Sequence, residues 1–396
     1  MSETKEIHIP LGPSPEKWDL LSKGIDPFGD QMILQMGPQH PATHGVLRLE
    51  LKTDGEVVTK ITPYIGYLHR CFEKVAESVT YPQVIPYTER MDYLAGMNMA
   101  LSYVLAVEKL REIEVNDRVE TLRVLVCELN RIASHCVAIG TFALDIGAWT
   151  PLLYLFQVRE HILDLLEELS GARMLFNYIR IGGLAHDIPT GWIDKVREFC
   201  TYMDPKIPEL NGLLSYNKIY IERLAHVGVM SQDVALQYGI TGPNLRATGF
   251  DYDMRRDAPY SGYEKYDFQP QIGAGEQGTP GDCWDRYIVR VREMEESLKI
   301  IRQACDRMPE GDVKETIPKS LRKMPEGEVY VTTEAPRGEL GIYLVSDGTD
   351  KPYRVKARSG AYCSVAAVPA ISLGGLIADL VAIVASIDIV LGEVDR

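Results

Sequence analysis

Residues 37–49 read GPQHPATHGVLRL and place two histidines, His40 and His44, in one short loop. The two prolines of this loop oppose helix formation and its two glycines permit tight turning, so the loop is predicted to be non-helical. Within residues 46–52 three leucines alternate with charged side chains, as in a half-buried strand, and a hairpin turn is predicted at 54–55 before a return strand over 57–65. We therefore expect the histidines on a turn at the end of a small antiparallel sheet, which would hold both imidazoles in place.

The composition is that of an ordinary globular protein with a large core. The chain has 396 residues, of which 45% are hydrophobic and 25% charged, enough for two or three structural units. Its formal charge of -14 argues against the basic surface that nucleic acid requires. The polar N-terminal segment shows no secretory signal, and the most apolar window, residues 376–391, is too short and too acidic to span a bilayer. We expect any membrane link to come through partner proteins.

The seven cysteines are scattered and none form a CxxC pair. Their apolar surroundings predict reduced, buried thiols in a reducing compartment. We expect no zinc site or metal cluster held by this chain.

The pattern of apolar residues predicts an α+β protein that is mainly helical, with a central helix bundle flanked by a small N-terminal antiparallel sheet and a small C-terminal sheet region. The expected regions are an irregular lead-in (1–30), the small β domain with the histidine loop (31–65), the helix bundle (66–238), a long ordered loop region (239–282), and a helix, small sheet and buried C-terminal helix (283–396). Helices are expected over 89–113, 117–148, 152–169, 192–226 with breaks, 284–308 and within 376–391. Strands are expected over 329–345 and 353–358, with a turn at 347–348.

The residue types leave two roles open for the histidine pair. A zinc peptidase would carry such a pair on one helix face, but Pro41 excludes a helix and no HExxH glutamate is present. The histidines could donate hydrogen bonds in a cleft, or they could only tie down their loop. Spacing alone favours the second role.

Other ionisable residues stand in helical patterns. Tyr93 is expected in the first turn of the helix that begins at Glu89, where its protonated hydroxyl could face a loop; the alternative is an ordinary core tyrosine. Glu128, Arg131 and His135 lie in the most apolar helix and are expected to form a buried structural network. Asp145, near the end of that helix, could reach a neighbouring loop and pair with an imidazole.

Four further charged residues, Arg70, Lys74, Asp379 and Asp388, are expected to have structural roles. Arg70 and Lys74 are expected to pair with acidic groups elsewhere in the bundle. Asp379 and Asp388 stand in the last apolar helix, where a carboxylate also needs a partner.

The order of many long motifs resembles one family, over residues 32–396. The motifs are GPQHPATHGVLRL, GYLHRCFEK, ERMDYL, CELNRIASH, LDIGAWTP, EELSGARM, RIGG, TGPNLRATG, GDCWDRYIVRVREM, RGELG, ADLVAIVASIDIV and GEVDR. They resemble the family of NADH-quinone oxidoreductase D subunits, the quinone-site subunits of bacterial respiratory complex I. The resemblance implies a fold similar to the large subunit of nickel–iron hydrogenases. Those proteins hold their metal with two cysteine pairs, of which only Cys71 remains here, so a pocket for an organic acceptor is implied instead.

The resemblance also implies roles for individual residues. His44 and Tyr93 would be the partners of the two quinone carbonyl oxygens, and Asp145 would pair with His44. His40 would line the same loop. Arg90 would lie toward the terminal iron–sulfur cluster of a partner subunit, and Asp388 and Val390, on the last helix, would line the cavity.

In this family the chain binds quinone as a substrate and holds no metal or flavin itself. Electrons would come from an iron–sulfur cluster in the adjacent subunit, and quinone reduction would be coupled to proton translocation by the membrane arm. The implied partners are the B subunit, which holds that cluster, the C subunit, and the membrane-arm subunit at the quinone entrance. The implied location is peripheral, on the cytoplasmic side of the bacterial inner membrane.

Two alternatives to this function stay open from the residues. One is a non-catalytic scaffold of the same complex, and the other is a nickel–iron hydrogenase-type large subunit. The family usually has glycine in place of Cys71 and phenylalanine in place of Leu391, so the type of quinone stays open.

Overall fold

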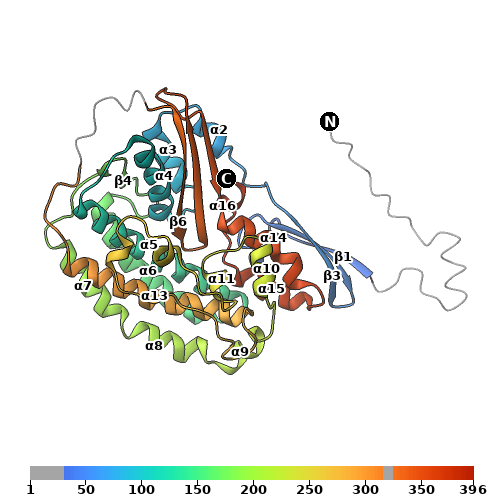
Figure 1. The fold of residues 1–396 in the computed structure, drawn as a ribbon. Coiled ribbons are helices and arrows are strands. Elements are labelled where there is room, and N and C mark those ends of the chain that lie inside the picture. Colours follow the sequence, from blue (N-terminus) through green and yellow to red (C-terminus); the bar gives the residue numbers. More distant parts are fainter. Residues whose placement is uncertain (1–30, 315–323) are drawn as a thin grey trace, which may run out of the picture.

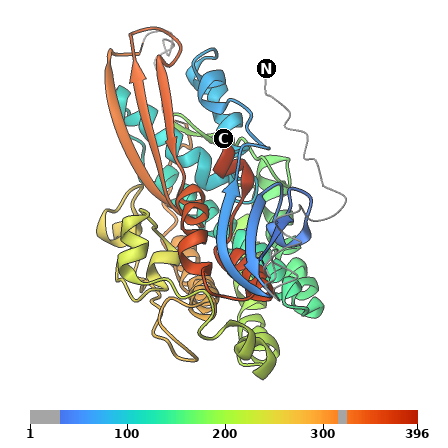
Figure 2. The same ribbon diagram turned by 90° about the vertical axis from the view of Figure 1, so that its right-hand side faces the viewer.

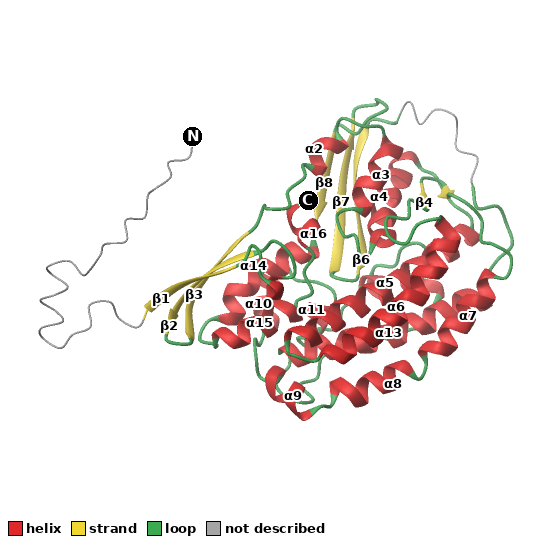
Figure 3. Ribbon diagram, turned by 180° about the vertical axis from the view of Figure 1, so that it is seen from behind, coloured by secondary structure: helices red, strands yellow, loops and turns green. Residues whose placement is uncertain are grey.

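The computed structural model describes residues 31–314 and 324–396. Long helices form the body, a C-terminal sheet packs beside helix α4 (Gly96–Arg111), and an N-terminal sheet projects away from the body (Figure 1). Figure 2 shows the C-terminal sheet in orange and the N-terminal sheet in blue, and Figure 3 shows how far helices dominate the rest. The predicted mainly helical α+β architecture with two small antiparallel sheets is confirmed.

The helices of the first half are η1 (Pro41–Thr43, a 3-10 turn), α2 (Phe72–Ala76), α3 (Tyr81–Glu89), α4, α5 (Asp117–Asp145), α6 (Trp149–Ser170) and α7 (Trp192–Met203). Next come α8 (Lys206–Leu210), η2 (Asn211–Ser215, a π-helix), α9 (Lys218–Leu224), α10 (Gln232–Gln237), α11 (Pro243–Arg246), α12 (Met254–Asp257) and η3 (Tyr263–Lys265, a 3-10 turn). The last are α13 (Cys283–Asp306), α14 (Gly360–Ser372), α15 (Ile377–Ser386) and α16 (Leu391–Asp395).

The strands of the described residues form three antiparallel sheets. They are β1 (Gln31–Met36), β2 (Arg48–Asp54) and β3 (Val57–Tyr64); β4 (Ile179–Arg180) and β5 (Gly183–Leu184); and β6 (Gly327–Ala335), β7 (Gly338–Ser346) and β8 (Arg354–Arg358). In the first sheet Leu51 pairs with Leu34 and with Ile61, and β3 packs on α14. The predicted hairpin is confirmed as β2 and β3, and the histidine loop connects β1 to β2.

Helix α5 is the central buried element. The Asn116 side chain caps its start by accepting a hydrogen bond from the Val119 N–H group (3.0 Å). The helix packs against α6 and α13 and is buried along most of its length. It ends at Asp145, three residues before the predicted end, so this carboxylate projects from the last helical turn.

The predicted helix over 89–113 is wrong at its start. Helix α3 ends at Glu89, α4 begins at Gly96, and a turn separates them. The physical reason lies at Asp92. Its Oδ1 accepts the Leu94 N–H group (3.1 Å), which competes with helical hydrogen bonding, and its other carboxylate oxygen is bonded to the distant Arg337. Tyr93 therefore lies in a turn between two helices. Helix α3 was not predicted, although Pro82 in its first turn is a favourable position for proline.

Two further predictions are corrected at the C-terminal end. The strand predicted over 329–345 is two strands, β6 and β7, joined by a tight turn at Pro336–Arg337. The helix predicted within 376–391 stops at Ser386, so Asp388 and Val390 follow helix α15 and precede α16. Asp388 has a left-handed backbone (φ 51°), which ends any helix at that point. Helix α14 was not predicted.

Side-chain burial differs from the prediction in two places. Five cysteines are buried as predicted, but Cys71 is exposed and Cys363 is partly exposed.

Arg70 donates its hydrogen bond to the carbonyl oxygen of Arg90 instead of a carboxylate. Lys74 pairs with Glu77 (2.8 Å), three residues on, and not with an acidic group elsewhere in the bundle.

Candidate functional site

The histidine loop is held by its own hydrogen bonds. Thr43 donates its backbone N–H (3.1 Å) and its hydroxyl (2.7 Å) to the His40 carbonyl oxygen. The His44 N–H donates to the Pro41 carbonyl oxygen (3.3 Å), and His44 adopts a left-handed backbone (φ 50°). A non-glycine residue in this conformation is uncommon, and it aims the His44 side chain out of the turn.

His44 and Asp145 meet directly. His44 Nε2 lies 2.5 Å from Asp145 Oδ2, and the two side chains are 14% and 10% exposed. The pair joins the histidine loop to the end of α5, elements separated by about a hundred residues. Because an ionised carboxylate only accepts hydrogen bonds, Nε2 carries the proton and Nδ1 is left without a hydrogen bond to any described residue. The C-terminal end of α5 adds partial negative charge beside this pair.

His40 has a different role. Its Nδ1 accepts a hydrogen bond from the Ala42 N–H group (3.3 Å), so this imidazole caps the short helix η1. The loop-tying role that spacing favoured therefore describes His40. His44, four residues on, has the partner that a functional histidine needs.

Tyr93 lies in the turn between α3 and α4 with its side chain 38% exposed. Within residues 31–314 and 324–396 its hydroxyl makes no hydrogen bond, and the structure does not join it to His44, His40 or Asp145. A free phenol at the surface of a single subunit is available to a ligand or to a partner.

The remaining predicted residues occupy two environments. Arg90 donates to the Pro86 carbonyl oxygen (2.7 Å) and lines an open hollow of about 500 Å³ with Val79, Gln83, Pro86 and Tyr87. Asp388 and Val390 are buried, and Asp388 pairs with Arg337 (3.1 Å) and Arg290 (3.7 Å). Asp388 thus has the structural partners expected for a buried carboxylate, and its place beside a cavity stays a prediction.

The predicted network in the middle of α5 is confirmed. Glu128 pairs with Arg131 (3.2 Å) and Arg255 (3.3 Å) and accepts hydrogen bonds from Tyr263 and Ser297. Burial alone would raise the pKa of Glu128, but the two guanidinium groups outweigh burial and hold it below its usual value. His135 Nε2 donates to Glu293 Oε2 (2.9 Å), and burial lowers the pKa of His135.

Two buried carboxylates, Glu89 and Glu393, form no ion pair with any residue that the structure describes. Burial raises the pKa of Glu89 to about 7, and its oxygens accept only the backbone N–H of Asn177 (2.7 and 2.9 Å). Burial also raises the pKa of Glu393 to about 7; one oxygen accepts from Ser359 and the other has no hydrogen-bond partner. Both carboxyl groups therefore gain and lose their proton near neutral pH.

Sequence reasoning missed Asp92 and Arg337. Both are fully buried and paired with each other, and Arg337 also binds Ser134 and Asp388. The available signal was an arginine inside the apolar stretch that contains RGELG, since a buried arginine requires carboxylate partners.

Comparison with known proteins decides the family. The model of the 49 kDa subunit of respiratory-chain NADH dehydrogenase matches residues 145–323 and 319–396. The NADH-quinone oxidoreductase D subunit of Chlorobium luteolum is 56% identical over 371 residues, covering 93% of this chain and 94% of that protein. The chain belongs to this family. The D subunit of Chlorobaculum parvum is also 56% identical, over 93% and 92% of the two chains, and that of Prosthecochloris aestuarii is 54% identical over 94% of each.

Membership of this family makes the chain a subunit of an NADH-quinone oxidoreductase complex, complex I, and places it in electron transport. None of the helices within residues 31–314 and 324–396 has the length and apolar character needed to cross a membrane. Over the same residues, no three His, Cys, Asp or Glu side chains are grouped so as to hold a metal ion.

Proposed function

We propose that the chain forms the quinone-reduction site of the complex, in its peripheral arm on the cytoplasmic side of the bacterial inner membrane. The site takes electrons from an iron–sulfur cluster in the neighbouring B subunit, and the reduction is coupled to proton translocation by the membrane arm. The C subunit and the membrane-arm subunit at the quinone entrance are the other partners. The fold is related to the large subunits of nickel–iron hydrogenases, whose metal-binding cysteine pairs are reduced here to Cys71.

The observation that carries the proposal is the bond between His44 and Asp145. A quinone that accepts two electrons develops negative charge on two oxygens at opposite ends of its ring, so a donor is needed at each end. With Nε2 held by Asp145, His44 can donate a hydrogen bond only from Nδ1, and only when the ring carries both protons. Asp145 stabilises that imidazolium, which makes His44 a donor of both a hydrogen bond and a proton.

Tyr93 supplies the second donor. Its hydroxyl is free of described partners and can bond the other carbonyl oxygen. Two electrons with one proton from His44 Nδ1 and one from the Tyr93 hydroxyl convert the quinone to the quinol. The imidazole then remains neutral and bonded to Asp145, and both donors must be reloaded before the next turnover. In this proposal Asp388 and Val390 line the cavity, His40 lines the loop of His44, and Arg90 lies toward the terminal iron–sulfur cluster of the B subunit.

Replacing Tyr93 with phenylalanine tests the proposal because it removes the hydroxyl and keeps the ring. In assembled complex we expect Tyr93→Phe to lower quinone reduction about 100-fold or more, the size of a lost proton donor. Tyr238→Phe is the matched control, since Tyr238 is an equally exposed tyrosine at the end of α10, and it should leave turnover unchanged.

Normal turnover of Tyr93→Phe in a fully assembled enzyme would support the scaffold alternative, in which the chain shapes the neighbouring cluster site and chemistry occurs elsewhere. The same preparation should reduce ferricyanide with NADH at the wild-type rate, because that soluble acceptor does not require the quinone site.

A further inference from the structure

The guanidinium group of Arg337 joins three separate elements in the core. Arg337 lies in the two-residue turn between β6 and β7 and is 1% exposed. Its Nη1 donates to the Asp92 carboxylate and to the Ser134 hydroxyl (3.1 Å), and its Nη2 donates to Asp388 Oδ1 (3.1 Å). The planar fork therefore bridges two carboxylates that lie on different segments of the chain.

Asp92 uses its other oxygen to fix the backbone around Tyr93. Asp92 Oδ1 accepts the Leu94 N–H group (3.1 Å), a hydrogen bond that spans Tyr93, and the Asp92 carbonyl accepts the Ala95 N–H group (3.1 Å). The Tyr93 hydroxyl itself has no described partner, so the direction of the phenol is set by the backbone that carries it. That backbone is held by a carboxylate that Arg337 holds in turn.

Asp388 connects the same guanidinium to the segment under the histidine loop. Asp388 precedes Val390 and α16, and the first residue of α16, Leu391, lies against Gly45: a Cβ atom added to Gly45 would lie 3.5 Å from Leu391 Cγ. Gly45 directly follows His44. One arginine thus ties the turn of Tyr93 to the segment that supports the loop of His44.

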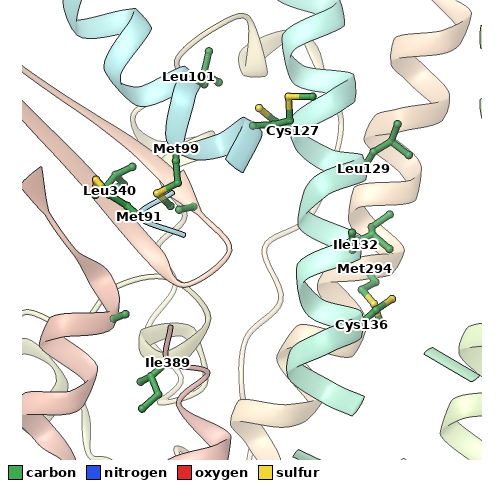
Figure 4. Close-up of a cluster of buried hydrophobic side chains, with 14 of the residues drawn as sticks. Met91, Met99, Leu101, Cys127, Leu129, Ile132, Cys136, Met294, Leu340 and Ile389 are labelled. Carbon is green, nitrogen blue, oxygen red and sulfur yellow. The ribbon is translucent and has the colours of Figure 1, made fainter. Parts of the chain in front are cut away.

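The three residues of the bridge lie out of solvent, since Arg337, Asp92 and Asp388 are all buried. Met91, Leu340 and Ile389, which lie close in sequence to Asp92, Arg337 and Asp388, are all buried, and Figure 4 shows them pointing into the apolar interior. A buried guanidinium that loses one carboxylate leaves an uncompensated charge, so the geometry of the bridge is strongly enforced.

We propose that Arg337 and Asp92 are positioning residues for quinone reduction: together they set the direction of the Tyr93 hydroxyl relative to His44. This inference rests on the proposed function of Tyr93. It predicts that the fork shape of Arg337, and not only its charge, is required, because one ammonium group cannot bridge both carboxylates in the same geometry.

Arg337→Lys in assembled complex tests the inference. We expect kcat for quinone reduction per assembled complex to fall at least about tenfold, with a change in KM for a short-tail quinone below about twofold, and with NADH–ferricyanide activity unchanged. Arg123→Lys is the matched control. Arg123 is equally buried, and both of its terminal nitrogens donate to the Glu108 carboxylate, far from Tyr93 in the sequence. The control should reduce at most the amount of complex and leave quinone kinetics normal.

The double variant Arg337→Lys/Tyr93→Phe separates positioning from general damage. If Arg337 acts through Tyr93, the double variant should be no slower than Tyr93→Phe alone, whereas independent effects would multiply. Multiplied losses, or normal quinone kinetics in Arg337→Lys, would overturn the inference and leave the role of Tyr93 standing. If Tyr93→Phe alone is fully active, the proposed function itself fails.

Asp92→Asn provides the second variant should Arg337→Lys not assemble. An asparagine oxygen still accepts the Leu94 N–H group, but the charge opposite Arg337 is lost. We expect Asp92→Asn to lower kcat for quinone reduction. Combined with Tyr93→Phe, it should cause no further loss. A loss that adds in full to that of Tyr93→Phe would contradict it.

Discussion

The middle and the end of helix α5 carry two different kinds of charge. In the middle, Glu128 is fully buried and bonded to two arginines, a tyrosine and a serine. At the end, Asp145 is 10% exposed and has one side-chain partner among the described residues, His44. A buried carboxylate with many partners, such as Glu128, stays ionised as long as the protein is folded. A carboxylate with one imidazole partner at a helix end, such as Asp145, could take part in proton transfer. If the proposed function holds, the contrast separates a structural carboxylate, Glu128, from a functional one, Asp145, on the same helix.

The largest effect is expected in the middle of the helix. Glu128→Gln leaves Arg131 and Arg255 without their shared carboxylate and should destabilise the protein by about 3–5 kcal/mol. We expect little assembled complex, measured by its yield after purification. Glu160→Gln is the control, because Glu160 pairs with Arg173 on the surface of α6 and should cost less than about 1 kcal/mol. Normal yield of the Glu128 variant would show that the network is not structural.

Asp145 should give the opposite result, normal assembly with slow chemistry. Asp145→Asn keeps the size of the side chain but removes the negative charge that stabilises a doubly protonated His44. We expect quinone turnover to fall about 10–100-fold, equivalent to about 1.4–2.7 kcal/mol of barrier. Asp164→Asn, at an exposed position on α6, should leave turnover unchanged. Unchanged turnover in the Asp145 variant would assign Asp145 to the structural class with Glu128.

Glu89 sharpens the comparison, because it is buried and forms no ion pair with a described residue, so that burial outweighs the opposing charges of Arg90 and Arg180. Burial raises its pKa from 4.5 to about 7, so the folded state keeps a proton that the unfolded state has lost. Stability must therefore fall as pH rises through this range, by about 1.4 kcal/mol between pH 6 and pH 8.

Glu89→Gln should remove this pH dependence while its amide oxygen still accepts the Asn177 N–H group. The measurement is thermal unfolding of the complex at pH 6 and pH 8, for wild type and variant. A wild type whose stability did not decline over this range, relative to the variant, would contradict the raised pKa.

Local patterns were sufficient to predict much of the fold. Alternating leucines around residues 47–51 predicted the N-terminal hairpin, and the apolar run after Asp117 predicted the buried helix α5. Asp145 was a candidate partner for a histidine because it stands where that helix ends. These features depend on residues near one another in the sequence.

The errors arose where distant residues override local propensity. The Tyr93 turn interrupts a helical pattern because Asp92 is bonded to Arg337, 245 residues away. Asp388 leaves the helical conformation where it meets the same arginine. No periodicity in a single sequence encodes such a pairing. The turn at Tyr93 and the bonds of Arg337 to Asp92 and Asp388 therefore required the three-dimensional structure.

The position of a bound quinone in the assembled complex tests the central claim most directly. A structure with a short-tail quinone should place one carbonyl oxygen about 2.6–3.2 Å from His44 Nδ1 and the other at similar distance from the Tyr93 hydroxyl, with His44 Nε2 still bonded to Asp145. A reactive head group bound away from these two side chains would contradict the account.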